Sequence, residues 1–454
     1  MKKIIAILLT GLITAYGQSA TEALKLTSNP EGIGVRAMGM GNAYSAVADD
    51  YSALYWNPAG LGQLKKTSFS VALSHDIYGQ NTDYLSRNLF SNQRTTRLNS
   101  IGLAYPFDVA RGSFVLAFGY QVLKGFDDFN KFSAYNTQSN GIGFDYGDDG
   151  FYSFDRNVQQ DYVISREGRL EAWSFGGALA LSPRFTAGAS ISFYGGKSDY
   201  TLNYTQTDIN NLYQLTDTQL DFYAYDYKQN LRQDYNGTEV KLSGMFDLSS
   251  HLKLATVITF PVAITINEDW SENDALTYDD PSVPVDEYDL GSYNFDYVVR
   301  TPYQFNLGLS FTSDVLVLSG SVDYADWSQL RYDVPDGRDA AEYNDLLLEN
   351  DRIREDFQPV LSYSGGGELA LANRTLFLRG GYRYVPTADK TLDKDYDRIY
   401  YSAGLGFAVD RNTMLNAAYS VGTWKNSANY IYTTQTVEEN KENKNIRLGI
   451  SYKF

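Results

Sequence analysis

The 454-residue sequence contains no cysteine and only two histidines. The missing cysteine excludes disulfides, thiolate metal sites, a cysteine nucleophile and a lipid anchor on an N-terminal cysteine. His75 lies at the end of a predicted strand and His251 in a predicted short turn, without the spacing of a catalytic triad or a metal site. We therefore expect neither an enzyme nor a cofactor nor a metal centre.

Basic residues are also scarce. There are 38 lysines and arginines against 55 aspartates and glutamates, which gives a formal net charge of −17. A nucleic-acid partner is not expected, because it requires a basic face that replaces the counterions of the phosphates. Clustered carboxylates such as Asp393, Asp395 and Asp397 offer oxygen ligands for Ca²⁺, but they lack the spacing of an EF-hand. We interpret them as solvated loop residues.

Beyond its first residues the chain lacks any apolar run of membrane-helix length. Its mean hydropathy is −0.35, which excludes a bundle of membrane helices. Residues 1–17 combine a positively charged start, a short apolar core and an Ala-Tyr-Gly cleavage signal. They are predicted to be a signal peptide for the general secretion pathway, too short to remain as an anchor. An exported chain without a helical anchor is periplasmic, secreted or an outer-membrane barrel.

From Ser68 onward apolar and polar residues alternate, which is typical of β-strands with one apolar and one polar face. Residues 252–266 and 297–311 are each predicted to be one strand with its apolar residues on a single face. The last strand shows the same pattern, and its apolar face consists of Ile446, Leu448, Ile450, Tyr452 and Phe454.

The lengths of the strands and loops favour a membrane barrel. Many alternating runs exceed the roughly 9–11 residues that a tilted membrane strand needs. Six short turns alternate with seven long acidic segments, which predicts an antiparallel barrel of about 14 strands over residues 67–454. The short turns are expected near 108–112, 182–184, 249–251, 313–314, 372–374 and 410–412, and the long loops over 77–97, 125–167, 200–235, 268–294, 328–356, 386–397 and 425–443.

The C-terminal Phe454 is expected to end the last strand and to close the barrel beside the first strand, near Phe69. A terminal aromatic residue resembles the signal that the outer-membrane insertion machinery reads. Tyrosines flank many strands, where a ring with a polar tip suits the membrane interface. The expected surroundings are therefore outer-membrane lipid and lipopolysaccharide, and the expected state is a monomer.

Residues 18–66 do not alternate and are rich in glycine and apolar residues. A barrel of about 14 strands has a lumen too wide for its own side chains to fill. We interpret this segment as an N-terminal hatch that plugs the lumen. The alternative is a flexible periplasmic extension, which the apolar content disfavours.

Three motifs in this segment carry a resemblance to a known family. They are Gly34-Val35-Arg36-Ala37-Met38-Gly39-Met40-Gly41-Asn42-Ala43, Ala46-Val47-Ala48-Asp49-Asp50 and Ala53-Leu54-Tyr55-Trp56-Asn57-Pro58-Ala59-Gly60-Leu61. The segment resembles the hatch of the FadL/TodX outer-membrane transport family. Later pieces are similar too: Arg300-Thr301-Pro302, Asp323-Tyr324-Ala325-Asp326-Trp327-Ser328 and Leu378-Arg379-Gly380-Gly381-Tyr382.

The resemblance implies a hatch-gated channel that takes up hydrophobic small molecules passively, either long-chain fatty acids or aromatic hydrocarbons. Such a cargo leaves sideways through an opening in the wall. The gating residues would be Trp56, Asn57, Pro58, Ala59 and Gly60, and the candidate ligand contacts are Leu24, Leu26, Met38 and Met40.

Two other functions stay open. A branch of the same family anchors or shuttles secreted proteins at the outer membrane, and the polar loops of this chain suit that role. A general polar porin is disfavoured by the hatch. A continuous apolar pocket beside the hatch would favour transport, whereas a lumen filled with polar side chains would favour the anchor.

Overall fold

The structure is a computed structural model that describes residues 18–28, 31–145, 151–215 and 220–454. The signal peptide predicted for residues 1–17 lies outside the described residues. The chain forms the predicted antiparallel barrel of fourteen strands, in which β3–β4, β11–β12 and β13–β14 are interrupted and count once each. In chain order the barrel strands are β1 (Ser68–Tyr84), β2 (Arg87–Phe107), β3 (Phe114–Gly125), β4 (Asp128–Asn136), β7 (Val158–Ser182), β8 (Phe185–Thr207), β10 (Leu220–Asp247), β11 (Leu252–Thr259), β12 (Ala263–Tyr278), β13 (Asp286–Arg300), β14 (Gln304–Thr312), β15 (Leu316–Asp326), β17 (Pro359–Leu371), β18 (Leu376–Val385), β19 (Arg398–Ala408), β20 (Thr413–Ala428) and β21 (Val437–Lys453).

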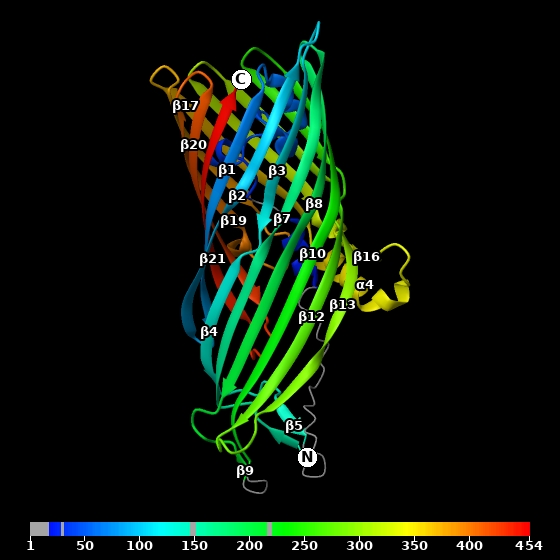
Figure 1. Ribbon diagram of the computed structural model, residues 1–454, viewed down its shortest axis with the longest axis vertical. Helices are drawn as coiled ribbons and strands as arrows, with labels where there is room; N and C mark the ends of the chain where they lie inside the picture. Colours follow the sequence, from blue (N-terminus) through cyan, green and yellow to red (C-terminus); the bar gives the residue numbers. More distant parts are fainter. Residues whose placement is uncertain (1–17, 29–30, 146–150, 216–219) are drawn as a thin grey trace.

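The first and last strands close the barrel, as predicted (Figure 1). Phe69 of β1 lies opposite Tyr452 of β21, and the backbone N–H of Phe454 donates to the carbonyl of Thr67 at 2.9 Å. Because the barrel is closed here, this part of the wall exposes no unpaired backbone N–H or C=O groups to lipid, which could not form hydrogen bonds with them. The C-terminus and the short turns lie at the same end of the molecule.

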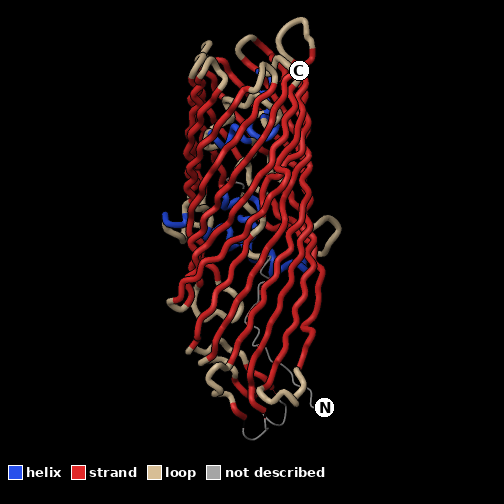
Figure 2. Tube along the Cα trace, turned by 60° about the vertical axis from the view of Figure 1, so that its left-hand side comes forward, coloured by secondary structure: helices blue, strands red, loops and turns tan. Residues whose placement is uncertain are grey.

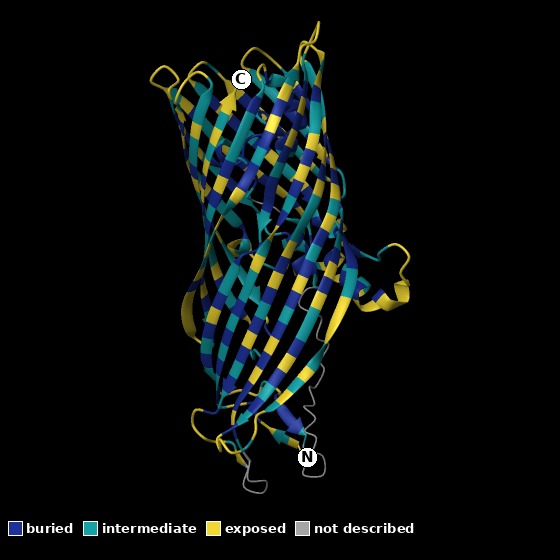
Figure 3. Cartoon of the chain, in the orientation of Figure 1, coloured by how far each residue is buried: buried dark blue, intermediate teal, exposed yellow. Residues whose placement is uncertain are grey.

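Along its length the barrel has two tiers of opposite polarity, which β10 shows clearly. Near the short turns Leu242 points outward and is exposed, while Lys241 points inward and is buried. Farther along the same strand Arg232 points outward, and Leu231 is buried inside. We call the first part the membrane tier, because its apolar face suits lipid, and the second the outer tier, because its polar face suits water. Figure 3 shows the alternation of buried and exposed residues along both tiers.

The outer tier corrects the prediction of long loops. Residues 77–97, 200–235 and 268–294 lie mostly in strands, and β7 already begins at Val158 within the predicted loop 125–167. Figure 2 shows strands that run through most of the length of the molecule. The prediction was wrong because these strands face water, so their outward residues are polar and acidic like those of loops.

The two segments predicted as continuous strands are interrupted at the same height. β11 ends at Thr259 and β12 begins at Ala263, while β13 ends at Arg300 and β14 begins at Gln304. Pro261 and Pro302 lie in the two breaks and cannot donate to a ladder.

Side chains change direction across these breaks. Ile258 is exposed on the membrane tier, whereas Ile264 is buried inside the outer tier. The alternation of apolar and polar residues nevertheless continues through each break. At the break the side chains switch between the outer and the inner face, and at the same place the apolar face of the barrel changes from the outside to the inside. The predicted single apolar face for 252–266 and 297–311 is therefore wrong.

A third break separates β3 from β4. Sheet pairing between β2 and β3 ends where Ser100 lies opposite Gln121, and beyond the break β4 pairs with β7. The carbonyl of Phe129 accepts a hydrogen bond at 3.1 Å from the inward-pointing side chain of Gln80 on β1. β4 has therefore stepped into the lumen, away from the line of the wall.

The outer tier is open on one side, because β14, β15, β17, β18 and β19 end near its border with the membrane tier. This side is covered by the segment between β15 and β17, from which α4 protrudes in Figure 1, and by residues 386–397. The elements of this cover are η3 (Trp327–Gln329), β16 (Arg331–Asp333), η4 (Ala340–Tyr343), α4 (Asn344–Asp356) and η5 (Lys394–Tyr396). The short strands β5 (Gly143–Asp145), β6 (Phe151–Ser153) and β9 (Gln214–Leu215) lie at the outer end.

The N-terminal segment fills the lumen and forms the hatch. Its elements are α1 (Ala20–Thr27), α2 (Val35–Gly39), α3 (Ala53–Trp56) and the 3₁₀ helix η1 (Pro58–Gln63). Inward side chains of the wall hold its backbone: Ser190 donates to the carbonyl of Leu54 and Ser310 to that of Ala46, each at 3.0 Å. Among the described residues, no helix is both long enough and apolar enough to cross a membrane.

Candidate functional site

The predicted gating residues form one tight turn of the hatch. The side chain of Asn57 donates to the carbonyl of Ser45 at 2.8 Å and accepts from the N–H of Ala59 at 3.1 Å, which caps η1. Pro58 follows at the first position of η1, where a missing N–H costs nothing. Trp56 donates to the carbonyl of Ile33 at 2.9 Å. The side chains of Asn57 and Trp56 therefore hold the turn together through hydrogen bonds, and this structural role is independent of any role in gating.

This turn lies directly against the wall. The N–H of Ala59 is 2.8 Å from the hydroxyl of Ser243 on β10. A Cβ on Gly60 would come within 2.3 Å of the carbonyl oxygen of Ala48, and one on Gly188 of β8 within 2.2 Å of the nitrogen of Ala59. The two glycines therefore permit an approach that a side chain would prevent.

Ion pairs bind the hatch to the wall on its other side. Arg36 lies 2.7 Å from Asp49 and 2.8 Å from Glu368 of β17, which also pairs with Arg379 at 2.6 Å. Burial raises the pKa of the Asp49 carboxyl, but Arg36 outweighs burial and holds this pKa below its usual range. The four charges therefore compensate one another inside the barrel.

Helix α1 lies farther toward the outer tier and has separate anchors. Glu22 pairs with Arg166 of β7 at 2.7 Å, and the N–H of Ala20 donates to Glu349 of α4 at 3.1 Å. At the C-terminal end of α1, the ammonium of Lys124 binds the carbonyls of Lys25 and Ser28. This arrangement complements the negative end of the helix dipole. Burial raises the pKa of Glu22, but Lys25 and Arg166 outweigh it and hold this pKa well below its usual range.

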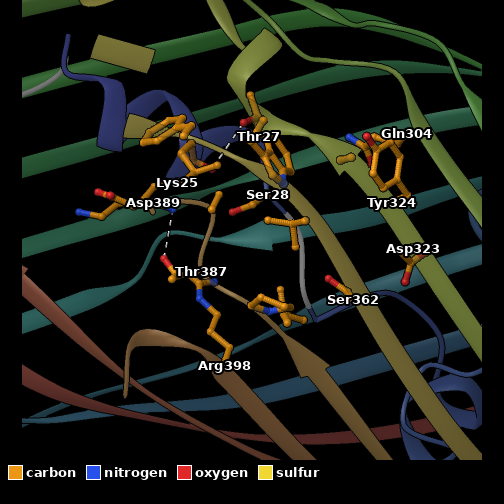
Figure 4. A pocket seen from close by; sticks show the side chains of 18 of the residues that line it. Lys25, Thr27, Ser28, Gln304, Asp323, Tyr324, Ser362, Thr387, Asp389 and Arg398 are labelled. Atoms are coloured by element: carbon orange, nitrogen blue, oxygen red, sulfur yellow. Dashed lines mark hydrogen bonds between the residues drawn. The ribbon is translucent and has the colours of Figure 1, made fainter. Parts of the chain in front are cut away.

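Two cavities lie beside α1. The first has a volume of about 310 Å³ and lies between α1, the hatch turn, the strands β11, β14, β15 and β17, residues 386–397 and the end of β20 (Figure 4). Its apolar lining includes Leu24, Trp56, Val257, Trp327, Val360 and Leu392. The second has a volume of about 170 Å³, and its apolar lining includes Leu26, Phe126, Tyr235, Ile266, Tyr297 and Val299.

The two cavities are neighbours, because Lys25, Arg398, Trp424 and Asn426 line both. The guanidinium of Arg398 lies over the ring of Trp424, 5.0 Å from its centroid. No ion pair between described residues includes Arg398 or Lys124. The cavities thus combine apolar side chains with charged ones. Among these, Arg398 forms no ion pair in the described part of the chain, and the ammonium of Lys124 is held by backbone carbonyls.

The structure separates the four predicted ligand contacts into two groups. Leu24 lines the first cavity and Leu26 the second. Met38 packs with Val35 against Ala72 and Ala418 of the wall, and Met40 belongs to the core of the hatch. Neither methionine is among the residues that line the two cavities.

Sequence reasoning missed Phe126, Arg398 and Trp424. Phe126 lies in the break between β3 and β4, and the other two lie near the border between the tiers. Which side of a strand faces the lumen there depends on where the wall breaks, which the alternation does not reveal.

The aspartates considered for Ca²⁺ have other partners. Asp393 accepts from the N–H of Asp395 at 2.8 Å and caps η5, Asp395 pairs with Lys425 at 2.5 Å, and Asp397 accepts from the N–H of Thr387 at 2.7 Å. These contacts fasten residues 386–397 to their neighbours.

Solved structures of several transporters and channels have the same fold. The toluene transporter TodX of Pseudomonas putida matches 93% of this chain and 99% of its own, with a TM-score of 0.58 and 15% identity. A FadL homologue of Pseudomonas aeruginosa covers 94% and 98%, with a TM-score of 0.56 and 14% identity. The monoaromatic hydrocarbon channel CymD covers 94% and 98%, with a TM-score of 0.52 and 12% identity.

No protein-family model and no curated protein matches the sequence. The likeness to solved structures confirms the resemblance to the FadL/TodX family at the level of the fold, which is a closed antiparallel β-barrel with an N-terminal hatch.

Proposed function

We propose that this protein is a passive outer-membrane channel for hydrophobic small molecules, gated by its hatch. The observation that carries the proposal is the pair of cavities beside α1, each lined by apolar side chains of both the hatch and the wall. A ligand in either cavity would contact the hatch, which has to move before the ligand can pass. The apolar interior of the outer tier would shield such a ligand from water.

The cavities also favour one of the two expected classes of cargo. A long-chain fatty acid would place its chain against the apolar side chains and its carboxylate beside Arg398, which lines both cavities. An aromatic hydrocarbon would leave the guanidinium of Arg398 without a carboxylate partner. We therefore propose an amphipathic acid as the preferred cargo, although solved channels with this fold include a toluene transporter.

The same observation weighs against a protein anchor. An anchor needs no ligand space in its lumen, and polar side chains would fill it. Here ligand space remains beside the hatch, and Leu26 of α1 belongs to the same buried apolar cluster as Ile264 of β12 and Val299 of β13.

The proposal is tested by uptake of a fluorescent dodecanoic acid and of radiolabelled toluene into cells whose own channel for these compounds is deleted. The protein is expected to raise the initial rate for the acid. Ala325→Trp, which fills the first cavity, should reduce this rate at least fivefold, and Arg398→Gln should reduce uptake of the acid more than that of toluene. Ala403→Trp on the exposed face of β19 is the matched control. Equal rates with and without the protein for both probes would contradict the proposal.

A further inference from the structure

The outer end of the barrel is closed by its own side chains. Residues 429–436 connect β20 to β21 and fold across the lumen, where the hydroxyl of Tyr162 donates to the carbonyl of Ile431 at 3.0 Å and Gln160 donates to that of Tyr432 at 3.1 Å. The ring of Tyr432 lies 5.1 Å from that of Tyr204 and 5.7 Å from that of Tyr227. These rings belong to a buried aromatic cluster, so a direct path from the tip to the cavities is blocked.

The open side of the outer tier is closed differently. We call residues 386–397, which connect β18 to β19, the flap. One border of the flap is bonded through the backbone to the segment before β17: the N–H of Gln358 donates to the carbonyl of Ala388 at 2.9 Å, and the N–H of Lys390 donates to that of Asp356 at 2.8 Å. This border is built like a sheet.

The other border of the flap faces β20 and is held through side chains. Sheet pairing between β19 and β20 begins where Ile399 lies opposite Thr423, although β20 continues to Ala428. Beyond that point, toward the outer end of the barrel, Asp395 pairs with Lys425 at 2.5 Å, and the hydroxyl of Tyr396 donates to Glu438 at 3.0 Å. Exposed ion pairs of this kind contribute little to stability, so this border is the weaker of the two. We call it the seam.

The first cavity extends to the seam. Its lining includes Leu392 of the flap on one side of the seam and Lys425 and Ser427 of β20 on the other. In Figure 4, Thr387 and Asp389 of the flap lie around the same cavity as Lys25 and Ser28 of α1. Parting the seam would therefore connect the outside with the space beside the hatch without disturbing the aromatic cluster.

The seam also lies next to the expected membrane surface. The flap follows directly after β18, whose Tyr384 ring lies 5.0 Å from that of Tyr363 on the outward face of β17. Tyr401, at the start of the membrane part of β19, is 60% exposed. Tyrosines in such positions mark the border between hydrocarbon and head groups.

We propose that cargo enters this protein sideways through the seam, taken from the surface of the outer leaflet, and that the flap swings away from β20 while it stays bonded to the segment before β17. This inference rests on the proposed function and adds the route. The lipid surface concentrates a hydrophobic molecule, and a side entrance at that level spares it the crossing of open water.

A cleavable cross-linker tests the route, because the chain has no cysteine of its own. The pair Asp395→Cys and Lys425→Cys spans the seam. The pair Asp356→Cys and Lys390→Cys spans the bonded border of the flap and is the matched control. A third pair, Asn136→Cys and Thr434→Cys, spans the tip, where the two side chains are 3.3 Å apart. Uptake of the fluorescent dodecanoic acid is measured before cross-linking, after it, and after cleavage with a reductant.

The proposal expects the cross-link at the seam to reduce the initial rate at least fivefold and cleavage to restore it. The cross-links at the bonded border and at the tip should change the rate less than twofold. Full uptake with the seam locked would overturn the route and leave the proposed function intact, as would a block by the cross-link at the tip alone. Absence of uptake before any cross-linking would overturn the proposed function, and the route with it.

Discussion

The guanidinium of Arg97 forms an ion pair with the carboxylate of Asp127 across the break between β3 and β4. Arg97 belongs to β2, and the same guanidinium also donates to the carbonyl of Gly168 at 3.3 Å. Sheet pairing between β2 and β3 has already ended at this height. A side-chain contact therefore closes the wall where the backbone does not.

Breaking this ion pair should destabilise the barrel. Arg97→Met would leave a buried carboxylate without a partner, which costs about 3–5 kcal/mol when the partner of a buried charge is removed. The double variant Arg97→Met/Asp127→Leu should regain most of that loss. Urea-induced unfolding in detergent measures both, and strictly additive losses would show that the two side chains do not interact.

The opposite polarity of the two tiers predicts an unusual result for arginine substitutions along β10. Leu242→Arg faces lipid and should cost about 2–4 kcal/mol near the middle of the membrane tier. Leu231→Arg faces the lumen and should cost at least about 3 kcal/mol, because it buries an unpaired charge. Asn236→Arg faces water and should change stability by less than about 0.5 kcal/mol.

The losses of stability are measured from the urea-induced unfolding midpoints of the three variants. A large loss for Asn236→Arg would place the outer tier inside the membrane. A small loss for Leu242→Arg would move the membrane tier elsewhere.

Removing the hatch should open the lumen. A chain without residues 18–66 keeps every strand of the barrel, so it should still fold and migrate differently with and without heating. Its conductance in planar bilayers should be several times that of the full chain. If the conductance does not change, the segment does not plug the lumen.

Glu22 should make the anchoring of α1 dependent on pH. Its pKa is held below the usual value of about 4.3 in the folded protein. The stabilisation of α1 by the charged Glu22 is thus complete above that value. It is lost as the pH falls below that value toward the pKa of Glu22 in the folded protein. Hydrogen exchange of the α1 amides, corrected for the intrinsic effect of pH, should therefore accelerate below about pH 4.

The variant Glu22→Gln should raise α1 exchange at pH 7 by about tenfold, equivalent to about 1.4 kcal/mol, and should remove the acid dependence. Glu355→Gln on the exposed face of α4 is the matched control. An unchanged pH profile in Glu22→Gln would show that this ion pair does not hold α1.

Much of the fold could be predicted from the sequence, because alternation, short turns and the terminal Phe454 all depend on local patterns. The breaks in the wall could not, since Ile258 and Ile264 keep the same phase in the sequence while facing opposite sides. The extent of the strands could not either, because a strand surrounded by water carries the same residues as a polar loop.

The candidate site was only partly predictable for a related reason. The turn around Asn57 is a local structure with its own sequence signal. The cavities are built from Leu24 of the hatch together with Arg398 and Trp424 of distant strands, and they exist only once the barrel has closed around the hatch. Nothing in the local sequence distinguishes Arg398 from any other arginine beside a loop.

Native mass spectrometry of the protein extracted in mild detergent tests the central claim most directly, because it detects what occupies the cavities without assuming its identity. The account predicts a bound hydrophobic small molecule that carries an acidic group, retained by the unchanged protein and by Ala403→Trp but lost in Ala325→Trp. A protein that carries no small molecule and holds a stable protein partner instead would contradict it.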